Sequence, residues 1–364
     1  MLYHSTRSCN DPVDSAQAVL NGLAPDGGLY VPGQLPKLDV EKCLSGSTME
    51  MAQTIIGAML PDVPDMKTLV ERAYTGKFET TELTPTVDTG KFTVLELFRG
   101  PTSAFKDVAL CMLPQLLTAA RKAKGMQEDI TILTATSGDT GKAALAGFAD
   151  VDGVQICVFY PNGGVSKVQR AQMVTQEGKN VHVCAVEGNF DDAQTGVKNI
   201  FAAGVEGKSL STANSINIGR LAPQITYYFK AYADLLARGQ IKMGDKVNFS
   251  VPTGNFGDIL AGYLAKKLGL PVGKLICASN ANNVLTDFIH TGTYDRRRPL
   301  HKTISPSMDI LVSSNLERLL YLMSEDAQMV NGLMQQLNTE GFYTVPDALK
   351  DEVFMLLETG SGLR

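Results

Sequence analysis

Short apolar runs rich in valine and isoleucine recur through the middle of this chain and constrain its fold more than any other feature. Each run is bounded by Gly, Asn, Asp or Pro. Because the runs are continuous rather than alternating, they predict strands buried on both faces, as in parallel sheets covered by helices. The runs lie at Ile130–Ala135, Val154–Tyr160, Val181–Val186, Val247–Val251 and Leu275–Ala278.

Segments with helical spacing separate these runs. Leu260, Leu264 and Leu268 recur every four residues and are followed by Gly269, which is suited to close a helix. A second helix is expected from about residue 106 to 122, with a kink at Pro114 because proline lacks the amide hydrogen. Strands that alternate with helices predict an α/β architecture.

The two ends of the chain differ from this middle part. Residues 1–85 are short helical pieces joined by loops, and we expect them to form a small, mainly helical N-terminal domain. Residues 86–364 then form the α/β region as two interleaved subdomains, mostly helical in pattern from residue 315 onward. A chain of 364 residues is long enough for two or three domains.

Composition and charge exclude several functions. The net charge of −5 argues against a nucleic-acid-binding surface, which needs clustered Lys and Arg. We expect the one basic run, Arg296–Arg298, to be a solvated loop. The sequence has neither a signal-peptide core nor a window long enough for a transmembrane helix. The chain is therefore expected in the cytoplasm, away from membranes, as a monomer or a homodimer.

The cysteines and histidines indicate no metal centre. Six cysteines and four histidines are scattered, without a Cys-x-x-Cys pair. Cys157, Cys184 and Cys277 lie within apolar runs, where we expect them to be small core residues. This usage fits a reducing compartment.

One lysine has an unusual setting. Lys106 follows a small, turn-prone and apolar stretch and directly precedes the expected helix. A lysine with little water around it has a lowered pKa, and its neutral amine can attack an aldehyde. Enzymes that use pyridoxal 5′-phosphate (PLP) need such a lysine for their Schiff base. The alternative is a solvated surface charge, which is what most lysines are.

Two glycine-containing turns follow predicted strands. Val251–Asp258 leaves backbone N–H groups free at the start of a helix, which suits a phosphate; the alternative is a plain tight turn. Its spacing matches neither a Walker loop nor G-x-G-x-x-G, so a nucleotide is not indicated. Thr134–Gly141 has the same arrangement with more hydroxyl groups. Its alternative is an ordinary helix cap, which is compatible with ligand binding.

A third polar cluster, Asn214–Arg220, precedes a helix expected at residues 221–237. Its arginine could clamp an anion with two hydrogen bonds, or it could simply be solvated on a surface loop. Together with Lys106, the three turns predict a phosphate-bearing cofactor held as a Schiff base. They also predict a substrate with a carboxylate and a second phosphate.

These segments resemble the motifs of the threonine synthases, PLP enzymes of the fold-type II (tryptophan synthase β-like) superfamily. The likeness extends over nearly the whole chain in the right order, and it implies the fold of that superfamily. The matching segments are Tyr3–Arg7, Gly22–Tyr30, Glu96–Asp107, Thr131–Gly141, Asn214–Arg220 and Pro252–Asp258.

The resemblance also implies roles for individual residues. Lys106 would form the Schiff base and move protons. Related enzymes have an asparagine where this chain has Asp139, in contact with the cofactor 3′-oxygen. A carboxylate would repel that oxygen, so we expect Asp139 to be protonated or turned away. The other implied residues are Gly254, Asn255, Phe256, Gly257 and Asp258 for the cofactor, Thr136, Ser137, Gly138 and Thr140 for the substrate, and Asn214, Ser215 and Arg220 for the substrate phosphate.

The implied reaction converts O-phospho-L-homoserine and water to L-threonine and phosphate, the last step of threonine biosynthesis. The alternatives are a related fold-type II PLP lyase, such as a dehydratase or phospho-lyase, and a catalytically impaired threonine-synthase-like protein. Members of the family usually continue past the point where this sequence ends. We therefore expect a C-terminal truncation that removes a hydroxyl partner of the pyridine nitrogen.

Overall fold

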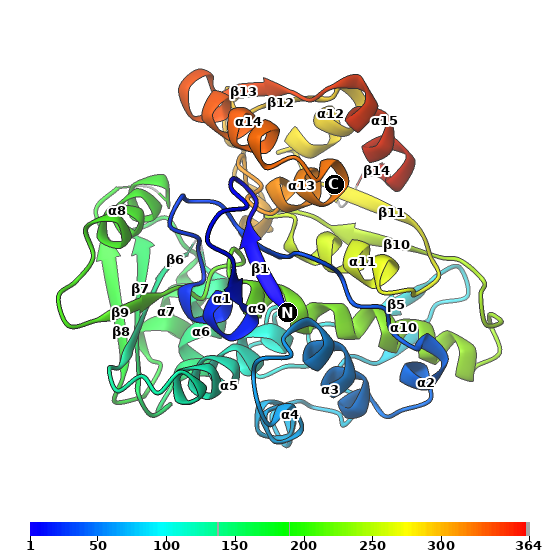
Figure 1. Ribbon diagram of the computed structural model, residues 1–364, viewed down its shortest axis with the longest axis horizontal. Helices are drawn as coiled ribbons and strands as arrows, with labels where there is room; N and C mark the ends of the chain where they lie inside the picture. Colours follow the sequence, from blue (N-terminus) through cyan, green and yellow to red (C-terminus); the bar gives the residue numbers. More distant parts are fainter. Residues whose placement is uncertain (137, 189, 362–364) are drawn as a thin grey trace.

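Two parallel sheets form the framework of the structure, a computed structural model that describes residues 1–136, 138–188 and 190–361. The first sheet has the order β8-β7-β6-β9 and lies on the left in Figure 1. The second has the order β10-β11-β14 and lies on the right. All pairings in both sheets are parallel, as the sequence predicts. The strands are β6 (Ile130–Ala135), β7 (Val154–Pro161), β8 (Val181–Val186), β9 (Ser209–Ser211), β10 (Val247–Pro252), β11 (Val272–Ser279) and β14 (Leu357–Ser361).

The prediction that every strand is buried on both faces is wrong for the edge strands β8 and β10, whose residues are mostly half-buried or exposed. Helix α8 (Phe190–Ala203) packs on β6 and β7. Cys184 lies on the edge strand β8 and is exposed, and Cys157 on β7 is half-buried. Neither is the core residue expected. Their sulfur atoms lie 3.6 Å apart. Cys277, on the central strand β11, is buried as predicted.

The helices follow the predicted spacing closely. Helix α5 (Asp107–Ala123) continues through Pro114, and α6 (Asp139–Phe148) follows β6. Helix α11 (Gly257–Lys267) closes at Gly269, which has a φ of +109°. The helix expected at 221–237 is instead divided around Pro223. Its pieces are α9 (Ile218–Leu221), the 3-10 turn η1 (Ala222–Gln224) and α10 (Ile225–Ala237).

The N-terminal region contains a small antiparallel sheet, β2-β1-β3, in addition to the expected helices. Arg7, just after the first strand of this sheet, forms a double hydrogen-bonded ion pair with Glu317, with both N···O distances at 2.9 Å. One continuous apolar core runs from Tyr3 to Leu357, so this region packs directly on the rest. The domain boundary at residue 85 stays a prediction. The elements are β1 (Leu2–Ser5), β2 (Val13–Asp14), α1 (Ser15–Asn21), β3 (Tyr30–Pro32), α2 (Val40–Leu44), α3 (Thr48–Met59), α4 (Met66–Tyr74) and the hairpin β4 (Thr86–Asp88) and β5 (Thr93–Leu95).

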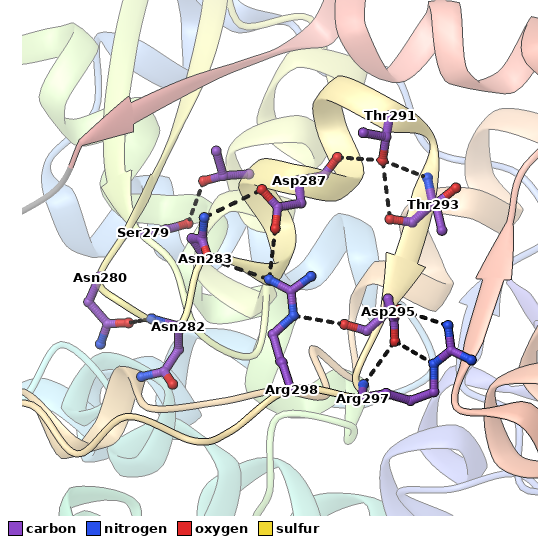
Figure 2. A network of polar contacts seen from close by, with 11 residues as sticks. Ser279, Asn280, Asn282, Asn283, Asp287, Thr291, Thr293, Asp295, Arg297 and Arg298 are labelled. Carbon is purple, nitrogen blue, oxygen red and sulfur yellow. Dashed lines mark hydrogen bonds and ion pairs between the residues drawn. The ribbon is translucent and has the colours of Figure 1, made fainter.

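The C-terminal part is mostly helical, as predicted, although β13 (Phe342–Thr344) and β14 are unexpected strands. The prediction of a solvated basic loop is confirmed for Arg297, which is exposed, whereas Arg298 is half-buried (Figure 2). Arg297 pairs with Asp295 at 2.9 Å and Arg298 pairs with Asp287 at 2.7 Å. Within the described residues, no helix is long and apolar enough to cross a membrane. The remaining elements are α7 (Lys167–Val174), α12 (Val284–Thr291), β12 (Thr293–Asp295), η2 (Pro306–Met308), α13 (Leu316–Ser324), α14 (Ala327–Glu340), β13 (Phe342–Thr344) and α15 (Asp347–Leu356).

Candidate active site

A cavity lies where the turns after β6 and β10 meet the start of α5. The space between its lining residues, including the part open to solvent, is about 510 Å³. The carboxyl ends of parallel strands are the usual place for ligand-binding sites. The lining includes ten of the predicted residues, and these come from all three polar turns as well as the lysine: Lys106, Thr140, Asn214, Ser215, Arg220, Gly254, Asn255, Phe256, Gly257 and Asp258.

Lys106 lies in this lining directly before α5 and is only 9% exposed. Its Nζ donates a hydrogen bond of 2.9 Å to Asp139 Oδ2. Burial lowers the pKa of Lys106, and the charge of Arg220 lowers it further. The ion pair with Asp139 offsets only part of this shift. The predicted shielding of the amine is therefore confirmed, and the amine is easier to deprotonate than that of an ordinary lysine.

Asp139 opens helix α6 and uses both carboxylate oxygens. Lys106 occupies Oδ2, and the hydroxyl of Ser307 donates a very short hydrogen bond to Oδ1. Burial alone raises the pKa of Asp139, but the Lys106 charge and these hydrogen bonds outweigh it, so the net pKa is lowered. The carboxylate is turned toward Lys106 and Ser307. The expectation that Asp139 is protonated or turned away concerns the 3′-oxygen of bound PLP, and it stays a prediction.

The turn between β10 and α11 has its carbonyl groups bound and its amides free. Ser313 Oγ donates to the carbonyl of Gly254 at 2.5 Å, and the Asn315 N–H donates to that of Asn255 at 3.1 Å. Phe256 adopts a φ of +65°, which turns the chain into the helix. Among the described residues, no acceptor bonds the N–H groups of residues 254–257. Free amides at the start of a helix form an anion site.

Asp258, in the first turn of α11, links this turn to helix α10 through hydrogen bonds. Its Oδ1 accepts hydrogen bonds from Tyr227 at 2.6 Å and Tyr228 at 2.9 Å. Burial raises the pKa of Asp258 to about 6, although the two tyrosine hydroxyls lower it. The carboxyl group therefore fixes the first turn of α11 to α10. Neither tyrosine stands in a motif that sequence reasoning singled out.

Arg220 is almost fully buried, at 2% exposure, so the alternative of a solvated surface arginine is wrong. Its Nη1 donates to the carbonyl of Ala213. Its Nε has no hydrogen-bond partner among the described residues. Burial lowers the pKa of the Arg220 guanidinium to about 10. A buried donor without a partner calls for an acceptor, and an anionic ligand in the cavity would supply one.

The turn after β6 is partly satisfied by its own residues. Thr136 Oγ1 accepts hydrogen bonds from the amides of Gly138 at 3.0 Å and Gly141 at 2.9 Å. The N-cap residue of α6 is Gly138, which makes no side-chain capping bond, so the ordinary cap given as the alternative is not formed. Thr136 is buried and does not line the cavity. Gly138 has a φ of +149°, and a Cβ there would meet Gln169 at 2.3 Å. Ser137, a predicted substrate residue, lies outside the described residues.

Several lining residues were missed by sequence reasoning. Gln224 accepts from the hydroxyl of Tyr227 at 3.2 Å, and Ser307 reaches Asp139 from a distant 3-10 turn. No local pattern distinguishes these residues, because they reach the cavity only through the tertiary fold. The remaining lining residues are Phe105, Pro252, Thr253 and Met308.

The residues present fit PLP: a buried amine is available for its aldehyde, and free amides are available for its phosphate. The fold and this donor set define a PLP-dependent enzyme. A family model described as pyridoxal-phosphate dependent enzyme matches residues 77–344. A second model, described as threonine synthase N terminus, matches residues 2–74. The chain belongs to the threonine synthase family.

Individual relatives agree with this assignment. Threonine synthase of Eremothecium gossypii is 40% identical, over 97% of this chain and 74% of its own length. Human threonine synthase-like 1 is 42% identical over 93% of this chain but only 48% of its own length. The PLP-bound crystal structure of threonine synthase from Brucella melitensis is 41% identical and superposes with a TM-score of 0.90, covering 99% of this chain and 78% of that one.

Proposed function

We propose that this chain uses PLP to convert O-phospho-L-homoserine and water to L-threonine and phosphate. One observation carries the proposal: a buried lysine shares its cavity with two separate anion-binding groups. The free amides of residues 254–257 suit the phosphate of the cofactor. The buried guanidinium of Arg220, with its unpaired Nε, suits the phosphate of the substrate.

The residues divide the work between binding and proton transfer. When bound, PLP supplies an aldehyde that condenses with amines and a ring that accepts electron density from the substrate. Lys106 would hold PLP through that aldehyde. When the substrate amine takes its place there, the freed amine of Lys106 would accept the proton from the α-carbon of the substrate. Asp139 and Ser307 hold the lysine amine in place. Thr140, which lines the cavity, and the neighbouring Gly138 would receive the substrate carboxylate, and Asn214, Ser215 and Arg220 would bind its phosphate.

The substrate phosphate separates this reaction from its alternatives. A substrate without a phosphate would leave the Nε of buried Arg220 unpaired, which costs free energy. A dehydratase is therefore disfavoured. The similarity to human threonine synthase-like 1 keeps the catalytically impaired protein as the second candidate.

Phosphate release tests the proposal. The PLP-loaded protein should release phosphate from O-phosphohomoserine, with threonine as the other product, and release little from O-phosphoserine. Equal or faster release from O-phosphoserine would indicate a phospho-lyase. Bound PLP with no turnover of either compound would indicate the impaired protein. Lys106→Ala is the control for background hydrolysis.

We also propose that the protein works in the cytoplasm. All six cysteines are free thiols, which suits a reducing compartment. A mass measurement without reductant, on protein taken directly from cells, should find no disulfide.

A further inference from the structure

Arg318, on helix α13, is a fully buried guanidinium whose hydrogen bonds go to neutral oxygen atoms. It is 0% exposed. Its Nε donates to the carbonyl of Tyr30 at 3.0 Å, Nη1 donates to Ser215 at 3.3 Å, and Nη2 donates to Ile216. One side chain therefore ties the N-terminal sheet to the backbone of the turn at residues 214–217. Burying a charge whose hydrogen bonds go to neutral groups costs free energy. This cost indicates that the contacts of Arg318 serve a purpose in the fold.

Asn315, directly before α13, extends this link to the other anion site. Its Oδ1 accepts a 2.6 Å hydrogen bond from Arg318 Nη1. Its Nδ2 donates to Ser215 Oγ and to the carbonyl of Asn255, both at 3.2 Å. Its backbone N–H donates to the same carbonyl at 3.1 Å. The side chain of Asn315 is thus shared by two turns that lie about forty residues apart in the sequence.

Arg318 determines which way the amide of Asn315 faces. A guanidinium only donates hydrogen bonds, so the oxygen of the amide must point toward it. The amide nitrogen then has to face Ser215 and Asn255. Because the carbonyl of Asn255 is held on this side, the N–H groups of its turn remain free for an anion.

We propose that Asn315 and Arg318 are positioning residues that set the spacing between the two anion-binding turns. Asn315 bridges the turns directly, and Arg318 acts through Asn315. The inference rests on the proposed function for the identity of the two anions. The spacing itself would serve any ligand that carries one anionic group at each turn.

The test compares two asparagines at helix starts, each beside an arginine. Asn315→Asp keeps the shape and the partner of Arg318 but removes both Nδ2 donors. The matched control is Asn283→Asp at the start of α12, where Asn283 Oδ1 accepts from Arg298 at 3.4 Å (Figure 2). Asn283 does not line the cavity. The readouts are the PLP affinity of cofactor-free protein, by absorbance titration, and KM and kcat for O-phosphohomoserine.

For Asn315→Asp we expect PLP affinity to fall and KM to rise, each by about tenfold, the loss expected from one or two neutral hydrogen bonds. We expect kcat to fall less. Asn283→Asp should stay within about twofold of wild type, a small fraction of one such bond. Values for Asn315→Asp within twofold of wild type, or an equal loss in Asn283→Asp, would overturn the proposal. If Asn315→Asp does not fold, Asn315→Ser is measured against the same limits. PLP affinity tests the spacing even if wild type fails to use O-phosphohomoserine.

Discussion

Two lysines of this protein are buried to a similar degree but sit in opposite surroundings. Lys106 is 9% exposed and Lys230, on α10, is 5% exposed. Lys230 has two carboxylates, Glu82 at 3.0 Å and Asp234 at 2.5 Å. Lys106 has one, Asp139, and shares its cavity with the positive charge of Arg220. Burial alone therefore does not make a lysine reactive; the balance of charges around the amine and access to a cavity do.

Removal of the reactive amine should have the largest effect. Lys106→Ala is expected to lower turnover by about a thousandfold or more, because the variant loses both the attachment point of PLP and the group that moves protons. No other lysine lines the described part of the cavity. Phosphate release measures the loss. Activity within tenfold of wild type would show that another group does this work.

The same kind of change at the other lysine should affect stability instead. Lys230→Met removes the charged partner of Asp234 and leaves only the hydrogen bond from Thr86, so we expect the free energy of unfolding to fall by about 3 kcal/mol. This figure is at the low end for a buried pair, because the side chain of Glu82 is 58% exposed. Denaturant unfolding measures the change, with PLP affinity as the control. If Lys230→Met folds fully but no longer binds PLP, the conclusion that Lys230 is structural and Lys106 is reactive is wrong.

A smaller, pH-dependent effect should follow from the carboxylate beside Lys106. The negative charge of Asp139 favours the ammonium form and so raises the pKa of Lys106 against the effect of burial. Asp139→Asn removes that influence, so the pKa should fall further and the neutral amine should appear at lower pH. The measurement is the rate at which an amine reagent modifies Lys106 in cofactor-free protein, as a function of pH. Lys230 is the internal reference, and a midpoint that stays or rises would contradict this account.

The parts of the fold and the site that the sequence predicts are those built from neighbouring residues. The strands β6 and β8 have the predicted ends because each apolar run begins directly after Asp129 or Asn180 and ends before a polar residue. Lys106 and the turn at 254–257 are predictable because each is a recognisable residue type, a lysine or a glycine-containing turn, directly before a helix. The exposed face of Cys184 could not be predicted, because it depends on the position of its strand in the sheet.

Other parts of the site depend on contacts between distant segments. Ser307 reaches Asp139 across 168 residues, and Arg318 reaches Tyr30 across 288. Nothing in the sequence around Arg318 distinguishes it from an exposed helix arginine. It is buried because α13 packs between the N-terminal sheet and the turn at residues 214–217. Such residues require the structure.

The most direct test of the central claim is to find which lysine holds PLP. Borohydride reduction of the PLP-loaded protein fixes the cofactor on the lysine that carries it, and peptide mass spectrometry then locates the added mass. We predict that the added mass is on Lys106 and that Lys230 is unmodified. Added mass on Lys230 or on any other lysine, with Lys106 unmodified, would contradict the account.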